Sequence, residues 1–150
     1  MRSFLLLLLL AAGAAAQELP PLDESFDQGV LVIVANRACH RFDIYLAVDT
    51  AQQRRGLMFV RELPPRSGML FVYAKPAHLS MWMKNTFIPL DMLFVRDDGV
   101  VASVETDTEP QSLRSVSAKE PVNYVLELNA GITRELGIGP GNRLLLDPRE

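Results

Sequence analysis

Short apolar runs separated by turn residues set the tightest limit on how this chain of 150 residues can fold. Each run has the length of a strand, is rich in branched aliphatic and aromatic residues, and stops near Gly, Pro, Asn or Asp. The nine runs predict about eight short strands, since the run at 113–116 is a weak one. The runs cover residues 30–35, 40–48, 69–74, 79–83, 90–95, 100–105, 113–116, 122–129 and 143–146.

Helical signals are few. Thr50 and Gln53 have the spacing of a capping box, and Gly56 can end the short helix that they open. Residues 132–136 form the second expected helix. Strands do not alternate with helices in a βαβ rhythm, and we see no internal repeat and no second domain. The chain is therefore predicted to be mainly β, a compact single-domain barrel-like or sandwich sheet with one or two short helices.

The centre of the chain, residues 79–95, is predicted to be a hairpin. An alternating run of apolar and polar residues ends in Lys84, Asn85 and Thr86. A proline then turns the chain into a second apolar run, which carries one carboxyl group, Asp91. Polar residues between two strands either hold a turn or line a site.

Two further turns connect neighbouring runs. Asn36-Arg37 joins the first two strands, and Asp97-Asp98-Gly99 joins two later ones. Asp-Gly between apolar runs is a strong signal for a short hairpin. Both turns therefore predict antiparallel pairing of the strands that flank them.

Residues 1–16 have the pattern of a signal peptide. Arg2 supplies a positive charge, an apolar stretch follows, and small residues at 14–16 provide a cleavage site. An uncleaved anchor is the weaker alternative, because a membrane span needs about 20 apolar residues. We expect an exported protein, periplasmic or secreted, with no membrane span after cleavage. A flexible tether over residues 17–29 then precedes a β-rich domain over residues 30–150.

Charge and cysteine content restrict the partners. The chain has 15 basic and 18 acidic residues, a net charge of −3, and no basic run, so we expect neither nucleic acid nor an anionic membrane surface as a partner. Cys39 is the one cysteine, so an internal disulfide is impossible. Its strand-like flanks predict a buried thiol; a redox or intermolecular partner is the alternative, and catalysis is the weakest reading.

Asp91 and Glu127 both lie inside apolar runs. A buried charge needs a partner, and Lys84 is the nearest candidate for Asp91 across the bend. A Lys84–Asp91 pair that locks the hairpin is thus the structural interpretation. If the strand of Glu127 lies beside the hairpin, the two carboxyl groups could instead converge and act as acid and base.

Trp82 is the one tryptophan. A core position is the ordinary expectation for Trp in an apolar strand, and a platform for a sugar or a peptide amide is the alternative. His40 and His78 are isolated, so no transition-metal site is expected. The chain has no nucleophile elbow, phosphate-binding glycine loop or dinucleotide fingerprint, and no cofactor is expected.

Four ordered motifs resemble the signature of the domain-of-unknown-function 192 family, over residues 44–146. The resemblance implies a mainly β single domain, often exported, with no established activity, so no catalytic residue is carried over. The motifs are Gly56-Leu57-Met58; Gly68-Met69-Leu70-Phe71; Trp82-Met83-Lys84-Asn85-Thr86 with Ile88-Pro89-Leu90-Asp91; and Val125-Leu126-Glu127-Leu128 with Gly131.

The leading functional hypothesis is a small periplasmic binding or accessory module, more consistent with a non-enzyme than with an enzyme. Its polar pocket would hold a small neutral or weakly charged ligand. One alternative is a hydrolase or lyase that uses Asp91 and Glu127; another is a structural partner of an envelope protein. The candidate ligand-binding residues are Trp82, Lys84, Asn85, Thr86, Asp91, Glu127 and Asn129.

Overall fold

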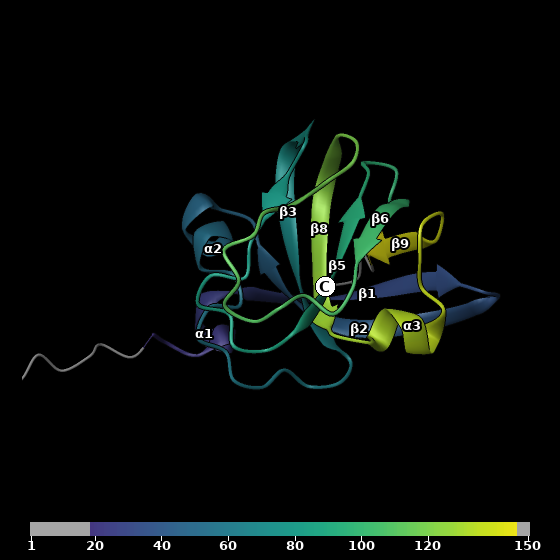
Figure 1. The fold of residues 1–150 in the computed structure, drawn as a ribbon. Coiled ribbons are helices and arrows are strands. Elements are labelled where there is room, and N and C mark those ends of the chain that lie inside the picture. The colour runs from purple at the N-terminus through teal and green to yellow at the C-terminus, as the bar shows by residue number, and fades with distance from the viewer. Residues whose placement is uncertain (1–18, 147–150) are drawn as a thin grey trace, which may run out of the picture.

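Nine strands and three short helices make up residues 19–146, the part of the chain that the computed structural model describes (Figure 1). Seven strands form one sheet in the order β6-β5-β8-β3-β2-β1-β9, and β4 and β7 form a separate pair. The mainly β prediction is confirmed. In chain order the elements are α1 (Leu22–Ser25), β1 (Asp27–Ala35), β2 (Ala38–Ala47), α2 (Thr50–Arg55), β3 (Ser67–Ala77), β4 (Ser80–Met81), β5 (Leu90–Val95), β6 (Val101–Glu105), β7 (Val116–Ser117), β8 (Val122–Asn129), α3 (Ile132–Leu136) and β9 (Arg143–Leu146).

The central strands are buried on both faces. All six residues of β5 are buried, and alternate residues of β5 belong to two different apolar clusters. Met92 and Phe94 pack in the first cluster, and Leu93 and Val95 pack in the second. A strand that must be apolar on both sides has a continuous rather than an alternating apolar run, which explains the sequence of residues 90–95.

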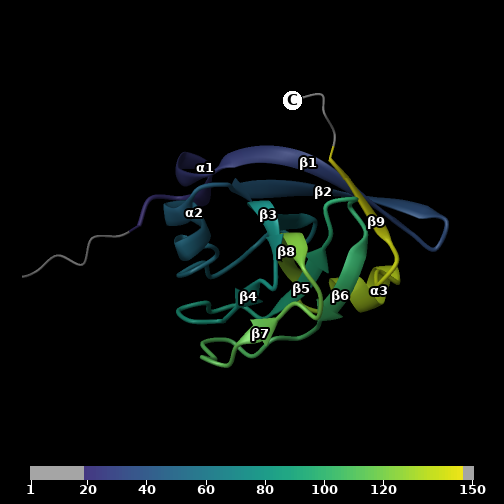
Figure 2. The same cartoon turned by 90° about the horizontal axis from the view of Figure 1, so that it is seen from above.

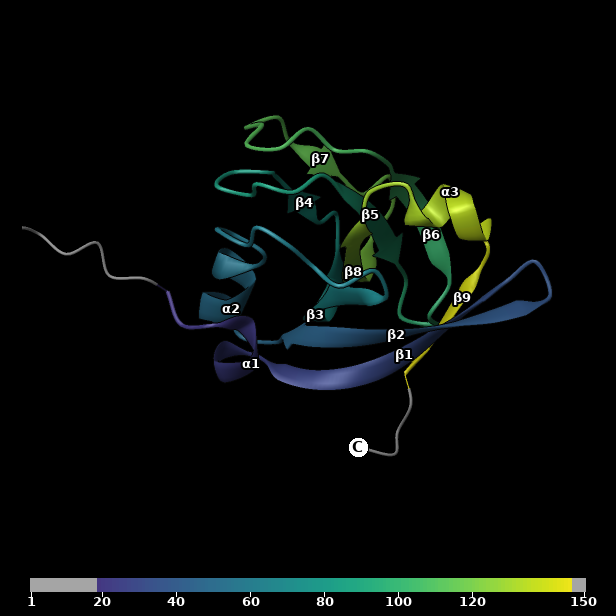
Figure 3. The ribbon, with the colours of Figure 1, turned by 90° about the horizontal axis from the view of Figure 1, so that it is seen from below.

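The sheet curls so strongly that its two edge strands, β6 and β9, touch at one place. Val100, just before β6, forms a β-bridge with Arg143 of β9. Backbone hydrogen bonds between residues 99–101 and 141–144 hold this junction. Figures 2 and 3 show β1, β2 and β9 on one side of β8, with the β4–β7 pair on the other side. The result is a half-barrel with one core cluster inside the curl and the other between β8 and the β4–β7 layer.

One pair of neighbouring strands is parallel, although the sequence has no repeating βαβ rhythm. β2 and β3 pair in parallel, with α2 in the connection between them. A parallel pair requires a crossover of a dozen or more residues, which the segment at 48–66 supplies. A short helix was predicted in this connection, but no pattern in the sequence indicated that the strands on either side of it pair in parallel.

The predicted central hairpin is wrong. β4 pairs with β7, whereas β5 pairs with β6 and β8. Residues 82–89 form a loop whose backbone is tied to distant segments: Met83 N–H donates to the Ser112 carbonyl, and Gln111 N–H donates to the Thr86 carbonyl. The other two turns were predicted correctly, since β1 pairs antiparallel with β2 and β5 with β6.

The cap of α2 lies one residue before the predicted position. Asp49 is the N-cap, and its carboxyl accepts a hydrogen bond from Gln52 N–H at 2.8 Å. The Gln52 side chain in turn accepts from the Asp49 N–H, which completes the capping box. The motif is therefore present with Asp49 and Gln52 in place of Thr50 and Gln53.

The expected tether is folded over the part that the structure describes. α1 lies at residues 22–25 and β1 already begins at Asp27. Phe26 is 4% exposed in the first core cluster, and the Arg55 guanidinium lies 5.3 Å above its ring. A buried aromatic ring anchors this segment despite its proline-rich, acidic sequence. The predicted signal peptide at residues 1–16 lies outside the described residues.

Cys39 is exposed, so the prediction of a buried thiol is wrong. It lies near the tip of the β1–β2 hairpin, which extends beyond the body of the half-barrel (Figure 1). The tip has few neighbours to bury a side chain. In residues 19–146, no helix has the length and hydrophobicity required to cross a membrane.

Phe26→Ala should destabilise the domain by about 3 kcal/mol, because truncation of a buried ring loses apolar burial and leaves a cavity. Phe59→Ala is the matched control: Phe59 is 49% exposed, and its loss should change stability by less than about 1 kcal/mol. Urea denaturation of both variants measures the difference. Equal stabilities would show that the Phe26 ring does not anchor this segment to the core.

Candidate functional site

Glu127 forms the floor of an open cleft of ≈ 560 Å³. The residue lies on β8 opposite Met69 of β3 and Met92 of β5, so its side chain points to the same face as these two methionines. This is the face covered by α2, the loop after α2, and β4. Glu127 is 4% exposed, and no residue from 19 to 146 donates a hydrogen bond to its side-chain oxygens.

Burial sets the protonation state of this floor. Loss of hydration raises the pKa of the Glu127 carboxyl from its ordinary 4.5 to about 8. At neutral pH the group is therefore mainly protonated and can donate one hydrogen bond. Tyr73 lines the same cleft from β3, and burial, followed by the charge of ionised Glu127, raises the pKa of its hydroxyl. The floor is uncharged at neutral pH.

Trp82 lies at the rim of the cleft, directly after β4, and is 49% exposed. The core expectation for Trp82 is thus wrong, and the platform alternative matches its position. The Lys84 ammonium lies 5.0 Å from the centre of the Trp82 ring, a cation–π distance. The predicted Lys84–Asp91 pair is therefore wrong: Lys84 is exposed, and its aromatic neighbour holds it at the cleft.

The end of α2 forms the opposite wall with Arg54 and Arg55. Arg55 also supports the N-terminal segment, since it donates to the Pro20 carbonyl and packs on Phe26. Its Nε is buried without a hydrogen-bond partner among the described residues, and burial lowers the pKa of the guanidinium. Within residues 19–146, Arg54, Arg55 and Lys84 take part in no ion pair.

Thr86 lines the cleft, but its neighbour Asn85 does not. The Thr86 hydroxyl donates to the Lys84 carbonyl at 3.3 Å, and Thr86 N–H donates to the Met83 carbonyl. Asn85 has a positive φ of 54°, a left-handed conformation that Asn tolerates better than most residues. Its role is to form the turn that presents Lys84 and Thr86.

Asp91 points to the opposite face of the sheet from Glu127. Asp91 pairs with Leu128, whereas its neighbour Met92 pairs with Glu127, and successive strand residues alternate faces. The fully buried Asp91 carboxyl accepts hydrogen bonds from Thr133 N–H at 3.1 Å, Thr133 Oγ1 at 2.6 Å and Asp107 N–H at 3.0 Å. The predicted convergence with Glu127 is wrong, and Asp91 instead fixes α3 and the loop after β6.

Asn129 also lies outside the cleft. Its side-chain amide donates to the Leu63 carbonyl at 2.9 Å and the Pro64 carbonyl at 3.0 Å. Asn129 therefore holds the connection between α2 and β3 against the end of β8. Of the seven candidate residues, the cleft gathers Trp82, Lys84, Thr86 and Glu127.

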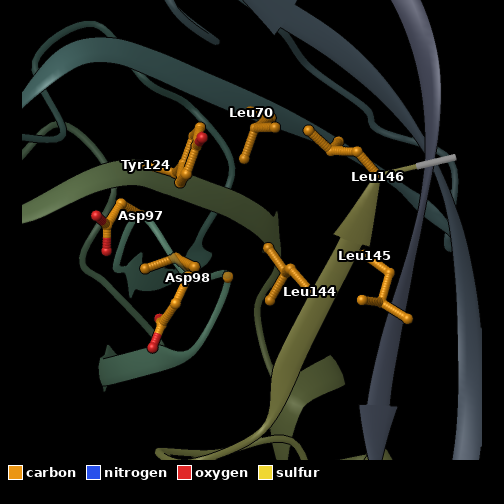
Figure 4. Close-up of a pocket in the computed structure, with 9 residues that line it drawn as sticks. Leu70, Asp97, Asp98, Tyr124, Leu144, Leu145 and Leu146 are labelled. Carbon is orange, nitrogen blue, oxygen red and sulfur yellow. The ribbon is translucent and has the colours of Figure 1, made fainter. Parts of the chain in front are cut away.

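A second, smaller hollow of ≈ 230 Å³ lies at the closed end of the half-barrel. Figure 4 shows Tyr124 and Asp97 on one side and Leu146 on the other. Asp98 at its edge is already engaged: the hydrogen bond from Arg96 lowers the pKa of this carboxyl, and Val100 N–H adds a second hydrogen bond. The lining is mainly apolar, with Asp97, Asp98 and Tyr124 as its polar side chains.

Metal ligands do not gather in the part of the chain that the structure describes: no group of three His, Cys, Asp or Glu residues is close enough to hold an ion. The cleft contains a single carboxyl group, Glu127, beside cationic side chains. The cleft can therefore offer a ligand hydrogen bonds, an aromatic surface and positive charge.

Sequence reasoning missed Arg54, Arg55 and Tyr73. Cations at the C-terminal end of a helix complement its dipole, and this role is sufficient to account for both arginines in the sequence without a binding site. Tyr73 shares a face of β3 with Met69 and Phe71 by strand alternation. The signal that could have found it was the pairing of β3 with β8, which residue patterns alone do not specify.

Asp91→Asn should destabilise the protein by about 3 kcal/mol, because an amide cannot accept all three hydrogen bonds and one donor is left unpaired in the core. Asp97→Asn is the control, since Asp97 is exposed and should matter by less than about 0.5 kcal/mol. Chemical denaturation compares them. A neutral or stabilising Asp91→Asn would show that the carboxyl is retained for something other than the fold.

Glu127→Gln should remove a pH dependence of stability. A carboxyl with a raised pKa binds its proton more tightly in the folded state, so its contribution is complete below about pH 4.5 and is lost as pH rises through about 8. The total is on the order of 4–5 kcal/mol. Unfolding free energies over this range should fall in the wild type, and the variant should lack this part of the decline.

Glu62→Gln provides the control for this measurement, because Glu62 is exposed and its substitution should keep the wild-type slope. Identical slopes for Glu127→Gln and the wild type would mean that Glu127 is ionised in the folded protein at neutral pH.

Comparisons with known proteins identify the family to which this chain belongs. A crystal structure from Sinorhizobium meliloti 1021, described as a proposed transcription regulator, is 39% identical, with a TM-score of 0.79 over 81% of this chain and 95% of that one. A protein of unknown function from Novosphingobium aromaticivorans DSM 12444 is 34% identical, with a TM-score of 0.80 over 88% and 94% of the two chains. Among curated proteins, none matches. The family model DUF192, described as Uncharacterized ACR, matches residues 31–146, and the chain belongs to this family.

Proposed function

We propose that this protein is a binding module that holds a small polar ligand in the cleft between Trp82 and the end of α2. The observation that carries the proposal is Glu127: a largely buried carboxyl that lines an open cleft and makes no hydrogen bond to the side chains or backbone of residues 19–146. Its hydrogen-bonding capacity is therefore available on the side of the cleft. A ligand in the cleft can accept the proton of Glu127 in a hydrogen bond.

The size and lining of the cleft support a small-molecule ligand. Ligand sites are typically concave, about 300–1,000 Å³, with apolar walls and a few convergent polar groups. The cleft of ≈ 560 Å³ combines Leu57, Phe71 and Met81 with the polar groups of Tyr73 and Glu127. The half-exposed ring of Trp82 offers a flat surface at the entrance.

Binding rather than acid–base catalysis is the proposed activity. Catalysis by a pair of carboxyl groups was the enzymatic hypothesis, and Asp91 and Glu127 lie on opposite faces of the sheet. The cleft thus has one carboxyl group and lacks the second member of that pair.

We further propose that the module acts outside the cytoplasm, in the periplasm or after secretion. The support is the sequence of residues 1–16, with its basic start, apolar stretch and small residues. Its partner is then a small ligand or an envelope protein. The Sinorhizobium structure is described as a proposed transcription regulator. We do not propose that role for this chain, because a net charge of −3 does not favour binding to nucleic acid.

A ligand panel of sugars, cell-wall peptides and small organic acids tests the proposal by thermal shift and calorimetry. At least one class should raise the melting temperature and change the fluorescence of Trp82, the one tryptophan in the chain. Trp82→Ala should weaken binding at least about tenfold while leaving the fold intact, since the ring is half exposed. Leu145→Ala, at the second hollow, is the control. A panel without any response would contradict the proposal.

A further inference from the structure

The charges around the cleft have one sign. Arg54 and Arg55 come from α2, and Lys84 comes from the loop after β4. The one acidic side chain in the lining is Glu127. Three cations therefore surround a floor that carries no charge near neutral pH, although the chain as a whole has a net charge of −3.

These cations are not used by the fold in ion pairs. Elsewhere in residues 19–146, four of the eight other arginines pair with carboxyl groups, as Arg96 does with Asp98 and Arg134 with Asp107. Arg54 and Lys84 are exposed at the cleft without such a pair in the same range. Because these cations line the same cleft, an anion bound there would be attracted by each of them.

Lys84 and Trp82 form a combined rim. The ammonium lies 5.0 Å from the ring centre, yet the indole keeps 49% of its surface exposed. A planar group can pack on the exposed part of the ring while an attached anionic group reaches Lys84. The rim thus matches a molecule that has a ring at one end and a negative charge at the other.

Taking the proposed function as its basis, we infer that the ligand of this cleft is a small organic anion that contacts Trp82 through a planar ring and binds Arg54 and Lys84 through its charged group. The neutral carboxyl of Glu127 donates a hydrogen bond to the ligand. Benzoate, benzyl alcohol and benzylamine, which share a ring and differ in charge, test this inference with Trp82 fluorescence as the readout.

Benzoate should bind at least about tenfold more tightly than benzyl alcohol or benzylamine. Lys84→Gln and Arg54→Gln should each weaken benzoate binding about threefold to tenfold and leave benzyl alcohol unchanged. Both side chains are exposed, so the variants should fold. Lys119→Gln removes an exposed cation outside the cleft and should leave all three affinities unchanged.

Benzoate binding should also depend on pH. The titratable or charged groups that share the cleft with Glu127 are Tyr73, Arg54, Arg55 and Lys84. Ionisation of Glu127 places a negative charge at the floor, so affinity should fall about tenfold between about pH 6 and about pH 9. Glu127→Gln keeps a donor at this position and should bind benzoate equally at both pH values.

The outcomes separate this inference from the proposed function. If benzyl alcohol or benzylamine quenches Trp82 as tightly as benzoate, or if neutral sugars bind and no anion does, the anion inference is overturned and the binding module stands. If neither these compounds nor any member of the wider panel binds, the proposed function itself fails. Unchanged benzoate affinity in Lys84→Gln and Arg54→Gln would also overturn the role of the cations.

Discussion

Two-sided burial of β5 and β8 is the constraint on which the rest of the structure depends. Both are interior strands of the sheet, with a neighbour on each side, and nearly every side chain on them is buried. Each therefore needs cover on both faces, a demand that one flat sheet cannot meet. The curl that brings β9 back to Val100 covers one face. The β4–β7 pair, α2 and the long loops cover the other (Figure 3).

This arrangement gives the two buried carboxyl groups opposite roles. Asp91 points toward the side of Thr133, where a backbone N–H and a hydroxyl were available to pair with it. Glu127, on the other face, lies beneath a cover built from loops, which leaves a cleft above it. The Asp91 carboxyl, with three hydrogen bonds, stabilises the fold. The Glu127 carboxyl has no partner among the described residues and is the group on which the proposed binding function rests. Asp91 pairs with Leu128, the neighbour of Glu127, so the two carboxyl groups point to opposite faces of the sheet and have different surroundings.

The local pattern of apolar and turn residues predicted most of the helices and strands. It could not predict which distant segments pair with one another. The bounds of β8, α3 and β9 agree with the expected ranges, because strong apolar runs and flanking glycines act within a few residues. The hairpin at residues 79–95 failed for a different reason: β4 is too short to cover β5 and pairs with β7 instead. The prediction of a buried Cys39 was wrong because a strand pattern does not show that the hairpin tip extends past the core.

The candidate site shows the same division. Trp82, Lys84 and Thr86 follow one another closely, and their polar cluster was visible in sequence. Whether Asp91 or Glu127 joins them depends on which face of β5 and β8 lies under the loop, a fact set by tertiary packing. Arg54 and Arg55 of α2 reach the cleft because α2 lies in the crossover between the parallel strands β2 and β3. The periodicity of the sequence did not indicate this parallel pairing.

Pairing of the first strand with the last has a consequence for how the chain reaches this state. Leu31 of β1 lies opposite Leu146 of β9, so the sheet is completed only after almost all of the chain is present. Contacts between such distant segments form slowly, because loop-closure entropy opposes them. Until then β1 has an open edge. The topology thus couples completion of the sheet to the presence of β9, which covers the edge of β1.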